Sequence, residues 1–275
     1  MRVPRLLAIH DLCVFGRCSL SAAVSVLSAR GVQCCPLPSA LFPAPTNYPG
    51  VTMTDLSEYA AGNLEQLKTL DTRFDAIYSG YLANTAQAAL VGRAHDAYPD
   101  ALRVVDPAMG DNGRLYRTID KPLTEAMKTL ADGANLITPN VTEAALLLGK
   151  PAGSAPADEG ELEQWLRALS GGGRSVVLTG ASFREGEIAV GWAERGAAGL
   201  FRHPRTGAGY PGAGDLFASY LLAEVLHGAA LGAAAEAAAR FTGECAAETV
   251  RRGTDPREGL LFEAVLKKTS VYSRD

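Results

Sequence analysis

The chain has 275 residues, and 30 acidic against 26 basic side chains give it a formal net charge of −4. Without a basic excess, a broad nucleic-acid interface is not expected. Hydrophobic residues make up 47% and charged residues 20%, which excludes a disordered chain. No apolar run approaches the roughly eighteen residues that a membrane-spanning helix needs.

Short apolar runs alternate with helical patterns along the chain. Strands are expected at 6–10, 33–41, 76–79, 103–105, 135–138 and 175–178, and an alternating pair at 187–192 and 199–203. Helices are expected at 19–29, 56–70, 86–98, 121–130, 141–148, 159–169, 215–226 and 233–249. This alternation predicts βαβ units around a parallel sheet, and the late pair predicts an antiparallel edge. With no repeat or long linker, one domain over residues 1–275 is expected, binding its ligands beyond the carboxyl ends of the strands.

The five cysteines lack zinc-ligand spacing, which favours free thiols in a reducing cytoplasm. Adjacent Cys34 and Cys35 are expected on opposite faces of a strand. The four histidines show no metal spacing either, and a structural role is expected for each of them.

The segment 212–215, Gly-Ala-Gly-Asp, directly precedes a predicted helix. Two glycines allow a tight turn, and the amides at a helix N-terminus attract an anion. Asp215 then stands where a carboxylate can take a proton from a hydroxyl that attacks a phosphoryl group. Alternatively, Asp215 only caps its helix, and spacing alone does not exclude that role.

Asn140 and Glu143 are three residues apart at another helix start and share a face. Glu143 can hold a hydrated magnesium ion through water, with Asn140 turned toward phosphate. The alternative is a capped helix with a solvated glutamate. Asp106 ends a strand, where a buried carboxylate needs a partner. Asp111, followed by Asn112 and Gly113, would by itself be a surface turn.

Three segments, in this order and spacing, resemble the ribokinase-like superfamily. Residues 105–113, Val-Asp-Pro-Ala-Met-Gly-Asp-Asn-Gly, are similar to the Asp-Pro-Val-Met-Gly-Asp segment of pyridoxal kinases. Residues 137–143, Ile-Thr-Pro-Asn-Val-Thr-Glu, are similar to their Thr-Pro-Asn-x-x-Glu segment. Residues 212–215 are similar to the superfamily's anion hole and catalytic aspartate. Weaker likeness covers most of the chain, and the closest match is to the pyridoxal kinases, including pyridoxamine kinases.

This resemblance implies a three-layer α/β/α sandwich with a mostly parallel central sheet and an antiparallel edge. It implies Asp215 as the catalytic base and an anion hole formed by Gly212, Ala213 and Gly214. It places magnesium at Glu143 and Asp106, and leaves a monovalent cation requirement open. It assigns ATP binding to Asp106, Asp111, Asn140, Thr179 and Gly180.

The resemblance also implies a substrate site at Asp11, Ser39 and Tyr81. Asp11 stands where many pyridoxal kinases have serine, so it departs from the family and can also be a turn cap. A carboxylate there can accept a hydrogen bond from a ring hydroxyl or from a protonated ring nitrogen. Arg17, in the adjacent loop, either closes over phosphate or is solvated.

The function implied is ATP-dependent phosphorylation of the hydroxymethyl group of pyridoxal, pyridoxine or pyridoxamine by a cytoplasmic homodimer. No nucleic-acid or membrane partner is expected. One alternative is a hydroxymethylpyrimidine kinase, whose Gly-Ser-Asp-x-Gly-Gly-Gly-Ala-Gly segment is replaced here by residues 11–19, Asp-Leu-Cys-Val-Phe-Gly-Arg-Cys-Ser. The other is a non-catalytic pyridoxal phosphate carrier, which has no need of Asp106, Glu143 and Asp215 together.

Overall fold

The strands form a nine-stranded sheet in the order β11-β10-β9-β8-β5-β4-β1-β2-β3. The computed structural model describes residues 2–207 and 209–269. The sheet's strands are β1 (Arg5–Cys13), β2 (Gln33–Phe42), β3 (Thr54–Asp55), β4 (Ala76–Ser79), β5 (Leu102–Val105), β8 (Leu136–Ile137), β9 (Ser175–Ala181), β10 (Glu187–Glu194) and β11 (Ala197–Pro204).

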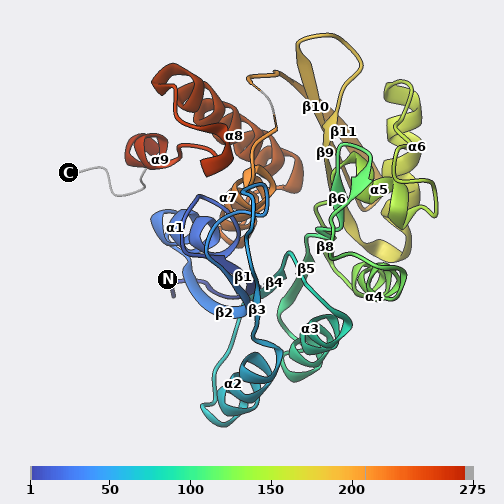
Figure 1. Cartoon of the computed structure of the whole chain (residues 1–275). Coiled ribbons are helices and arrows are strands. Elements are labelled where there is room, and N and C mark those ends of the chain that lie inside the picture. Colours follow the sequence, from blue (N-terminus) through green and yellow to red (C-terminus); the bar gives the residue numbers. More distant parts are fainter. Residues whose placement is uncertain (1, 208, 270–275) are drawn as a thin grey trace.

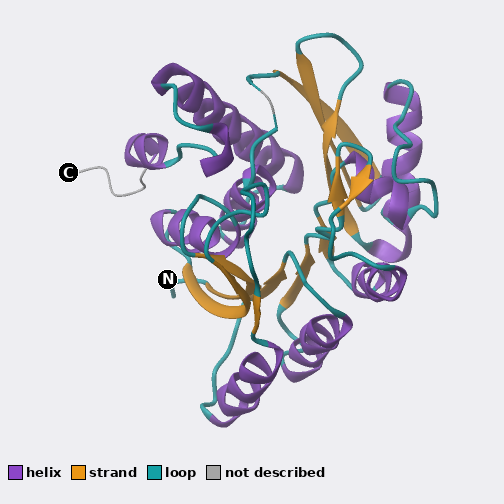
Figure 2. Cartoon of the chain, viewed as in Figure 1, coloured by secondary structure: helices purple, strands orange, loops and turns teal. Residues whose placement is uncertain are grey.

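Most neighbouring strands are parallel, as the alternation of strands and helices predicts. The six strands β2, β1, β4, β5, β8 and β9 run parallel to one another, whereas β10 pairs antiparallel with both β9 and β11. The predicted antiparallel edge is therefore confirmed (Figure 2). β3 adds an antiparallel strand at the opposite edge, which was not predicted because its two residues are polar and exposed and belong to no apolar run.

Helices cover both faces of this sheet (Figure 1). α1 (Ser19–Ala29), α7 (Ala213–Leu226) and α8 (Leu231–Arg252) pack on one face, and α9 (Glu263–Thr269) packs against α8. The other face carries α2 (Ser57–Thr69), α3 (Thr85–Ala97), α4 (Lys121–Asp132), α5 (Val141–Leu147) and α6 (Glu159–Leu169). The three-layer sandwich expected from the sequence is confirmed.

Alternation along the strands builds two hydrophobic cores. Leu6 and Ala8 of β1 point into the core under α1, α7 and α8, while Leu7 and Ile9 point into the opposite core. Cys34 packs on the first core and the adjacent Cys35 packs on the second, as predicted. All five cysteines are free thiols.

The loop after β5 folds into a small hairpin of β6 (Gly110–Asp111) and β7 (Arg114–Leu115). Asn112 and Gly113 at its tip have φ values of 51° and 75°, which fits a tight hairpin turn. The predicted surface turn is therefore present. The Gly113 N–H donates to Thr142 Oγ1 at 2.9 Å, so the hairpin rests on the start of α5. Within residues 2–207 and 209–269, no helix is both long and apolar enough to cross a membrane.

Candidate active site

The side chains predicted to bind ligands line the carboxyl edge of the parallel strands. In sheet order they are Thr179 near the end of β9, Asn140 after β8, Asp106 after β5, Tyr81 after β4, Asp11 on β1 and Ser39 on β2. This edge is where open α/β sheets bind their ligands. The predicted nucleotide residues lie toward β9 and the predicted substrate residues toward β2, with Asp106 between them.

A glycine turn brings α7 to this edge. Gly212 has φ +76°, and a Cβ there would lie 2.2 Å from the Arg17 carbonyl oxygen, so no larger residue fits without movement of the backbone. No side chain caps α7 at Gly212, and the Ala213 N–H donates to the Tyr210 carbonyl at 3.3 Å. The remaining amides of the first turn and the helix dipole favour an anion at this point.

Asp215 lies in the first turn of α7 without capping it. Its Oδ2 accepts a 2.7 Å hydrogen bond from the Ser19 backbone N–H, and its Oδ1 lies 3.7 Å from His10 Nδ1. Ser19 has φ 51°, a conformation uncommon for a residue with a side chain. Burial raises the pKa of Asp215, and the Ser19 N–H opposes that rise. The carboxylate is therefore a stronger base than one in water.

Asp11 is 4% exposed and lies where the pairing register of β1 and β2 shifts. Such bulges often direct a side chain into a functional site. Its Oδ2 accepts from Cys13 Sγ at 3.6 Å, and its Oδ1 has no hydrogen-bond partner among the described residues. Burial raises the pKa of Asp11 to about 7; the nearby Ser19 side chain opposes that rise and the charge of Asp215 adds to it. The unsatisfied oxygen is suited to a donor on a ligand.

Ser39 and Tyr81 lie on either side of Asp11 in the strand order. Ser39 is fully buried, and its hydroxyl likewise finds no partner within the described part of the chain. The Tyr81 ring meets Phe42 edge-on, with 6.0 Å between centroids, and its hydroxyl is 2.7 Å from Thr118 Oγ1. Burial is the main cause of the raised pKa of Tyr81, and the charge of Asp11 raises it further.

Asn140 and Glu143 form a reciprocal cap at the start of α5. Asn140 Oδ1 accepts the Glu143 N–H at 3.0 Å, and Glu143 Oε2 accepts the Asn140 N–H at 2.8 Å. Glu143 Oε1 also accepts the Met109 N–H at 3.3 Å, while Asn140 Nδ2 donates to the Gly110 carbonyl at 2.8 Å. The helix is thus capped, but Glu143 is 3% exposed rather than solvated.

Asp106 and Glu143 are two buried carboxylates, and Asp106 lies beside the glycine turn. Burial raises both pKa values well above the usual range, with a further rise for Glu143 from Asp106 and for Asp106 from Asp215. A Cβ on Gly214 would lie 3.8 Å from Asp106 Oδ2, so Asp106 faces the turn directly. A cation held between these acids and an anionic ligand would relieve their repulsion.

The donor set fits a hydrated magnesium ion. Within residues 2–207 and 209–269, no group of three or more His, Cys, Asp or Glu side chains is arranged to hold a metal alone. Mg²⁺ usually keeps several waters and binds one or two carboxylates together with substrate phosphates. Asp106 and Glu143 are two buried carboxylates of the kind that such a site needs.

The remaining predicted nucleotide residues differ in their placement. Thr179 lies beside Asn140 in a parallel bridge, and its N–H donates to the Pro139 carbonyl at 3.0 Å. Gly180 follows with φ +84°. Asp111 is exposed on β6, where its carboxylate accepts from the Asn112 N–H at 2.8 Å.

The sequence analysis did not identify three groups that the structure places in the site, namely the backbone N–H groups of Ser19 and Met109 and the side chain of His10. The Ser19 and Met109 donors are backbone groups, which any residue type supplies. His10 was expected to be structural, yet its ring faces Asp215. The position of His10 directly before Asp11 was the one sequence feature that could have pointed to it.

Arg17, for which the sequence left open a phosphate contact or a solvated position, pairs with Glu263 at 2.7 Å and Glu258 at 3.4 Å.

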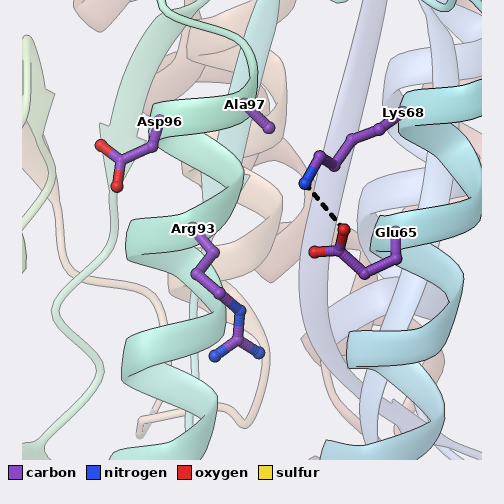
Figure 3. A pocket seen from close by; sticks show the side chains of 5 residues that line it. All are labelled: Glu65, Lys68, Arg93, Asp96 and Ala97. Carbon is purple, nitrogen blue, oxygen red and sulfur yellow. Dashed lines mark hydrogen bonds and ion pairs between the residues drawn. The ribbon is translucent and has the colours of Figure 1, made fainter.

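A separate surface hollow of about 310 Å³ lies between α2 and α3 and holds none of the predicted site residues. Its lining is mainly charged, and Lys68 pairs with Glu65 at 2.7 Å within it (Figure 3). The lining residues are Glu65, Lys68, Arg93, Asp96 and Ala97.

Comparison with known proteins identifies the family of the chain. A family model described as phosphomethylpyrimidine kinase matches residues 21–258. The chain is 31% identical to a Bordetella avium protein named pyridoxine/pyridoxal/pyridoxamine kinase, over 85% of this chain and 81% of that protein. A Bacteroides thetaiotaomicron structure that is described as a phosphomethylpyrimidine kinase, in a crystal form with pyridoxal, is 34% identical, with a TM-score of 0.93, covering 100% of this chain and 98% of that one.

The pyridoxal kinase of Lactobacillus plantarum has a TM-score of 0.89 at 29% identity, over 97% of this chain and 96% of that one. The fold, the family model and the relatives that match over most of their length thus all indicate the same family of kinases. The chain belongs to the phosphomethylpyrimidine kinase family and is a kinase of the pyridoxal kinase group within the ribokinase-like superfamily.

Proposed function

We propose that this kinase transfers the γ-phosphoryl group of ATP to the hydroxymethyl group of pyridoxal, pyridoxine or pyridoxamine. One observation carries the proposal: Asp215 lies in the first turn of α7, with its Oδ1 3.7 Å from Nδ1 of His10, the neighbour of Asp11 on β1, while a Cβ on the preceding Gly214 would lie 3.8 Å from Asp106 Oδ2. A base in that position can reach an alcohol on the Asp11 side and a phosphate on the Asp106 side. The relative named for all three vitamers and the neighbour with pyridoxal support this substrate class.

In the proposed reaction, Asp215 takes the proton of the hydroxymethyl group. The alcohol oxygen forms a bond to the γ-phosphorus while the bond to the bridging oxygen of ADP breaks. The N-terminal turn of α7 faces the charge that develops on the transferred group. Asp106 and Glu143 would hold magnesium, which supplies positive charge to the phosphates. Asn140 and Thr179 border the phosphate position on the β9 side.

Asp11 is proposed to bind the polar edge of the pyridine ring. Its unsatisfied Oδ1 is buried, so a donor from the ring or from an aminomethyl group would remove a costly unmade hydrogen bond. Ser39 and Tyr81 are proposed to line the same subsite. A carboxylate at this position favours a substrate that carries positive charge.

Hydroxymethylpyrimidine is the second candidate substrate, because the matching family model is named for its phosphate ester. The buried acid at position 11 favours the pyridine substrates instead. A carrier that binds pyridoxal phosphate without transfer would not need Asp106, Glu143 and Asp215 together, of which Asp106 and Glu143 are buried.

The proposal treats the chain as a single kinase domain, because both hydrophobic cores pack on one continuous sheet. Assembly as a homodimer, a cytoplasmic location and any monovalent cation requirement stay predictions. Light scattering on the purified protein measures the first, and replacement of potassium by sodium in the assay measures the last.

The deciding experiment supplies the purified chain with ATP and magnesium and each alcohol in turn. Pyridoxal, pyridoxine, pyridoxamine and hydroxymethylpyrimidine are compared by kcat/KM, with Asp215→Asn as the inactive control. Higher kcat/KM for at least one pyridine vitamer than for hydroxymethylpyrimidine supports the proposal. Preference for the pyrimidine selects the second candidate, and ligand binding without transfer selects the carrier.

A further inference from the structure

His10 is a fully buried histidine for which the proposed reaction has no role. Its side chain is 0% exposed, on β1 directly before Asp11. Neither ring nitrogen has a hydrogen-bond partner among the described residues, and Nδ1 lies 3.7 Å from Asp215 Oδ1. Buried polar atoms are rarely left unpaired, because each costs free energy comparable to a lost hydrogen bond.

The surrounding residues fix the ring in this orientation. A Cβ on Gly80 would lie 2.2 Å from both Cε1 and Nδ1 of His10, so only glycine leaves room for the imidazole. On another side the Tyr78 ring meets it edge-on, with 4.2 Å between centroids. The Nδ1 edge is therefore held toward Asp215 by packing from β4 and the residue that follows it.

The imidazole beside Asp215 is neutral. Complete burial lowers the pKa of His10 to about 3. A charged imidazole would form an ion pair with Asp215 and make the carboxylate a weaker base. A neutral ring can still donate one hydrogen bond, provided that the proton is on the nitrogen that faces the carboxylate.

We propose that His10 is a positioning residue for Asp215: it carries its proton on Nδ1 and donates it as a hydrogen bond to Asp215 Oδ1 when substrate is bound. The separation of 3.7 Å is longer than a hydrogen bond, and such contacts often tighten in the substrate complex. Ser19 holds Oδ2, so a donor at Oδ1 fixes the rotation of the carboxylate. Each oxygen keeps a lone pair for the proton of the alcohol.

The kinetic test, which rests on the proposed function, compares His10→Asn with His10→Leu. Asparagine places an N–H donor near the position of Nδ1, whereas leucine fills similar space without a donor. His10→Leu is expected to lower kcat about tenfold or more, the scale of one hydrogen bond to a charged group, with the KM for ATP unchanged. His10→Asn is expected to stay within about threefold of the parent.

His95→Leu is the matched control, because His95 is also buried, at 5% exposure, and lies on α3 outside the site. Its kcat should equal that of the parent. Melting temperatures and nucleotide affinity for all variants separate a loss of fold from a loss of turnover. Equal falls in kcat for His10→Asn and His10→Leu, or no fall in either, would overturn the proposal.

A second measurement does not depend on turnover. Nitrogen-15 NMR of labelled histidine distinguishes the two tautomers of a neutral ring, and the His10→Asn spectrum assigns the His10 signals. A proton on Nδ1, with a signal that shifts in Asp215→Asn, is expected. A proton on Nε2 would overturn the inference even in an active kinase. A chain that phosphorylates none of the tested alcohols would instead contradict the proposed function, and the tautomer would still decide the role of His10.

Discussion

At the scale of single residues, the environment of Asp215 determines how well it serves as a base. Burial raises its pKa, and one backbone N–H on Oδ2 limits that rise. Neighbouring donors or a bound cation would oppose that rise, because they stabilise the ionised carboxylate. The residues around Asp215 matter to catalysis for this reason.

Asp215→Asn tests that role most directly. General-base catalysis is typically worth roughly 10²–10⁴, so kcat should fall by at least about a hundredfold. Nucleotide affinity, measured by fluorescence titration without substrate, should change little because the fold and the amides of α7 remain. A variant with near-normal kcat would remove Asp215 from the mechanism.

Asp11→Ser tests the choice of substrate. The KM for pyridoxamine should rise more than the KM for pyridoxal, because only the aminomethyl form adds a cationic donor, and a hydrogen bond between charged groups is worth roughly 1.5–3 kcal/mol. The pKa of Asp11 is about 7, so its carboxylate is ionised above that pH. The preference of the parent for pyridoxamine should therefore grow as the assay pH rises through 7.

Steady-state kinetics with both vitamers, in the parent and in Asp11→Ser, provides the measurement. Equal losses for the two vitamers would show that Asp11 binds the ring hydroxyl or nitrogen that they share. No loss for either would place Asp11 outside the substrate site.

At the scale of secondary-structure elements, the start of α5 combines a helix cap with the proposed metal site. Glu143→Gln should raise the magnesium concentration that gives half-maximal rate, because a carboxylate charge is lost. The fold should survive, since glutamine at this position also closes a capping box. Rate against magnesium concentration, with the melting temperature as control, measures both effects. An unchanged magnesium curve would contradict the assignment of Glu143.

The start of α7 depends on glycine for a different reason. Gly212→Ala should lower both kcat and the melting temperature, because φ is +76° and the new Cβ would lie 2.2 Å from the Arg17 carbonyl oxygen. Gly243→Ala in α8 is the matched control. A Cβ there meets nothing within 4 Å, and alanine favours a helix by about 1 kcal/mol over glycine. Equal stability for the two variants would contradict the strained-turn argument.

The elements that sequence reasoning located are those with a local pattern. α6 (Glu159–Leu169) and β4 (Ala76–Ser79) lie where they were predicted, because apolar spacing along each segment reports the face that it buries. β3, β6 and β7 are two residues long and, unlike the equally short β8, contain no pair of buried apolar residues. Helix α9 was not predicted either.

The candidate site divides in the same way. Asp106, Asn140 and Asp215 were found from motifs, and the structure brings all three to the carboxyl edge. The Ser19 N–H that holds Asp215 comes from 196 residues away, and a backbone donor leaves no mark in the sequence. The contact between His10 and Asp215 likewise exists only once the sheet has placed β1 beside the start of α7. These contacts with Asp215 depend on how the fold brings distant segments together, so the residue types alone do not predict them.

At the scale of the whole molecule, the sheet collects four acids in a largely buried edge. Asp11, Asp106, Glu143 and Asp215 all have pKa values raised mainly by burial. An acid with a raised pKa in the folded state destabilises the fold when it is ionised. The empty enzyme should therefore lose stability as the pH rises, and ligands that bring positive charge or donors should restore it.

Asp11→Asn tests this linkage. The pKa of Asp11 is about 7 in the folded chain against 3.8 for an exposed aspartate. Between these values the folded state binds more protons than the unfolded state, so the parent's free energy of unfolding falls as pH rises, and the full penalty is present above about pH 7. A shift of about three pKa units is worth on the order of 4 kcal/mol.

Asparagine has the same shape and no charge, so Asp11→Asn should melt several degrees higher than the parent at about pH 8, since each kcal/mol shifts the melting temperature by roughly 2–4 °C in a domain of this size. The difference should shrink as pH falls through 7 and vanish below about pH 4, where the carboxyl is protonated in both states. Thermal unfolding without ligands across this range is the measurement. A stability difference that is constant with pH would mean that Asp11 ionises at its ordinary pKa, and that its buried oxygen is already satisfied before any substrate binds.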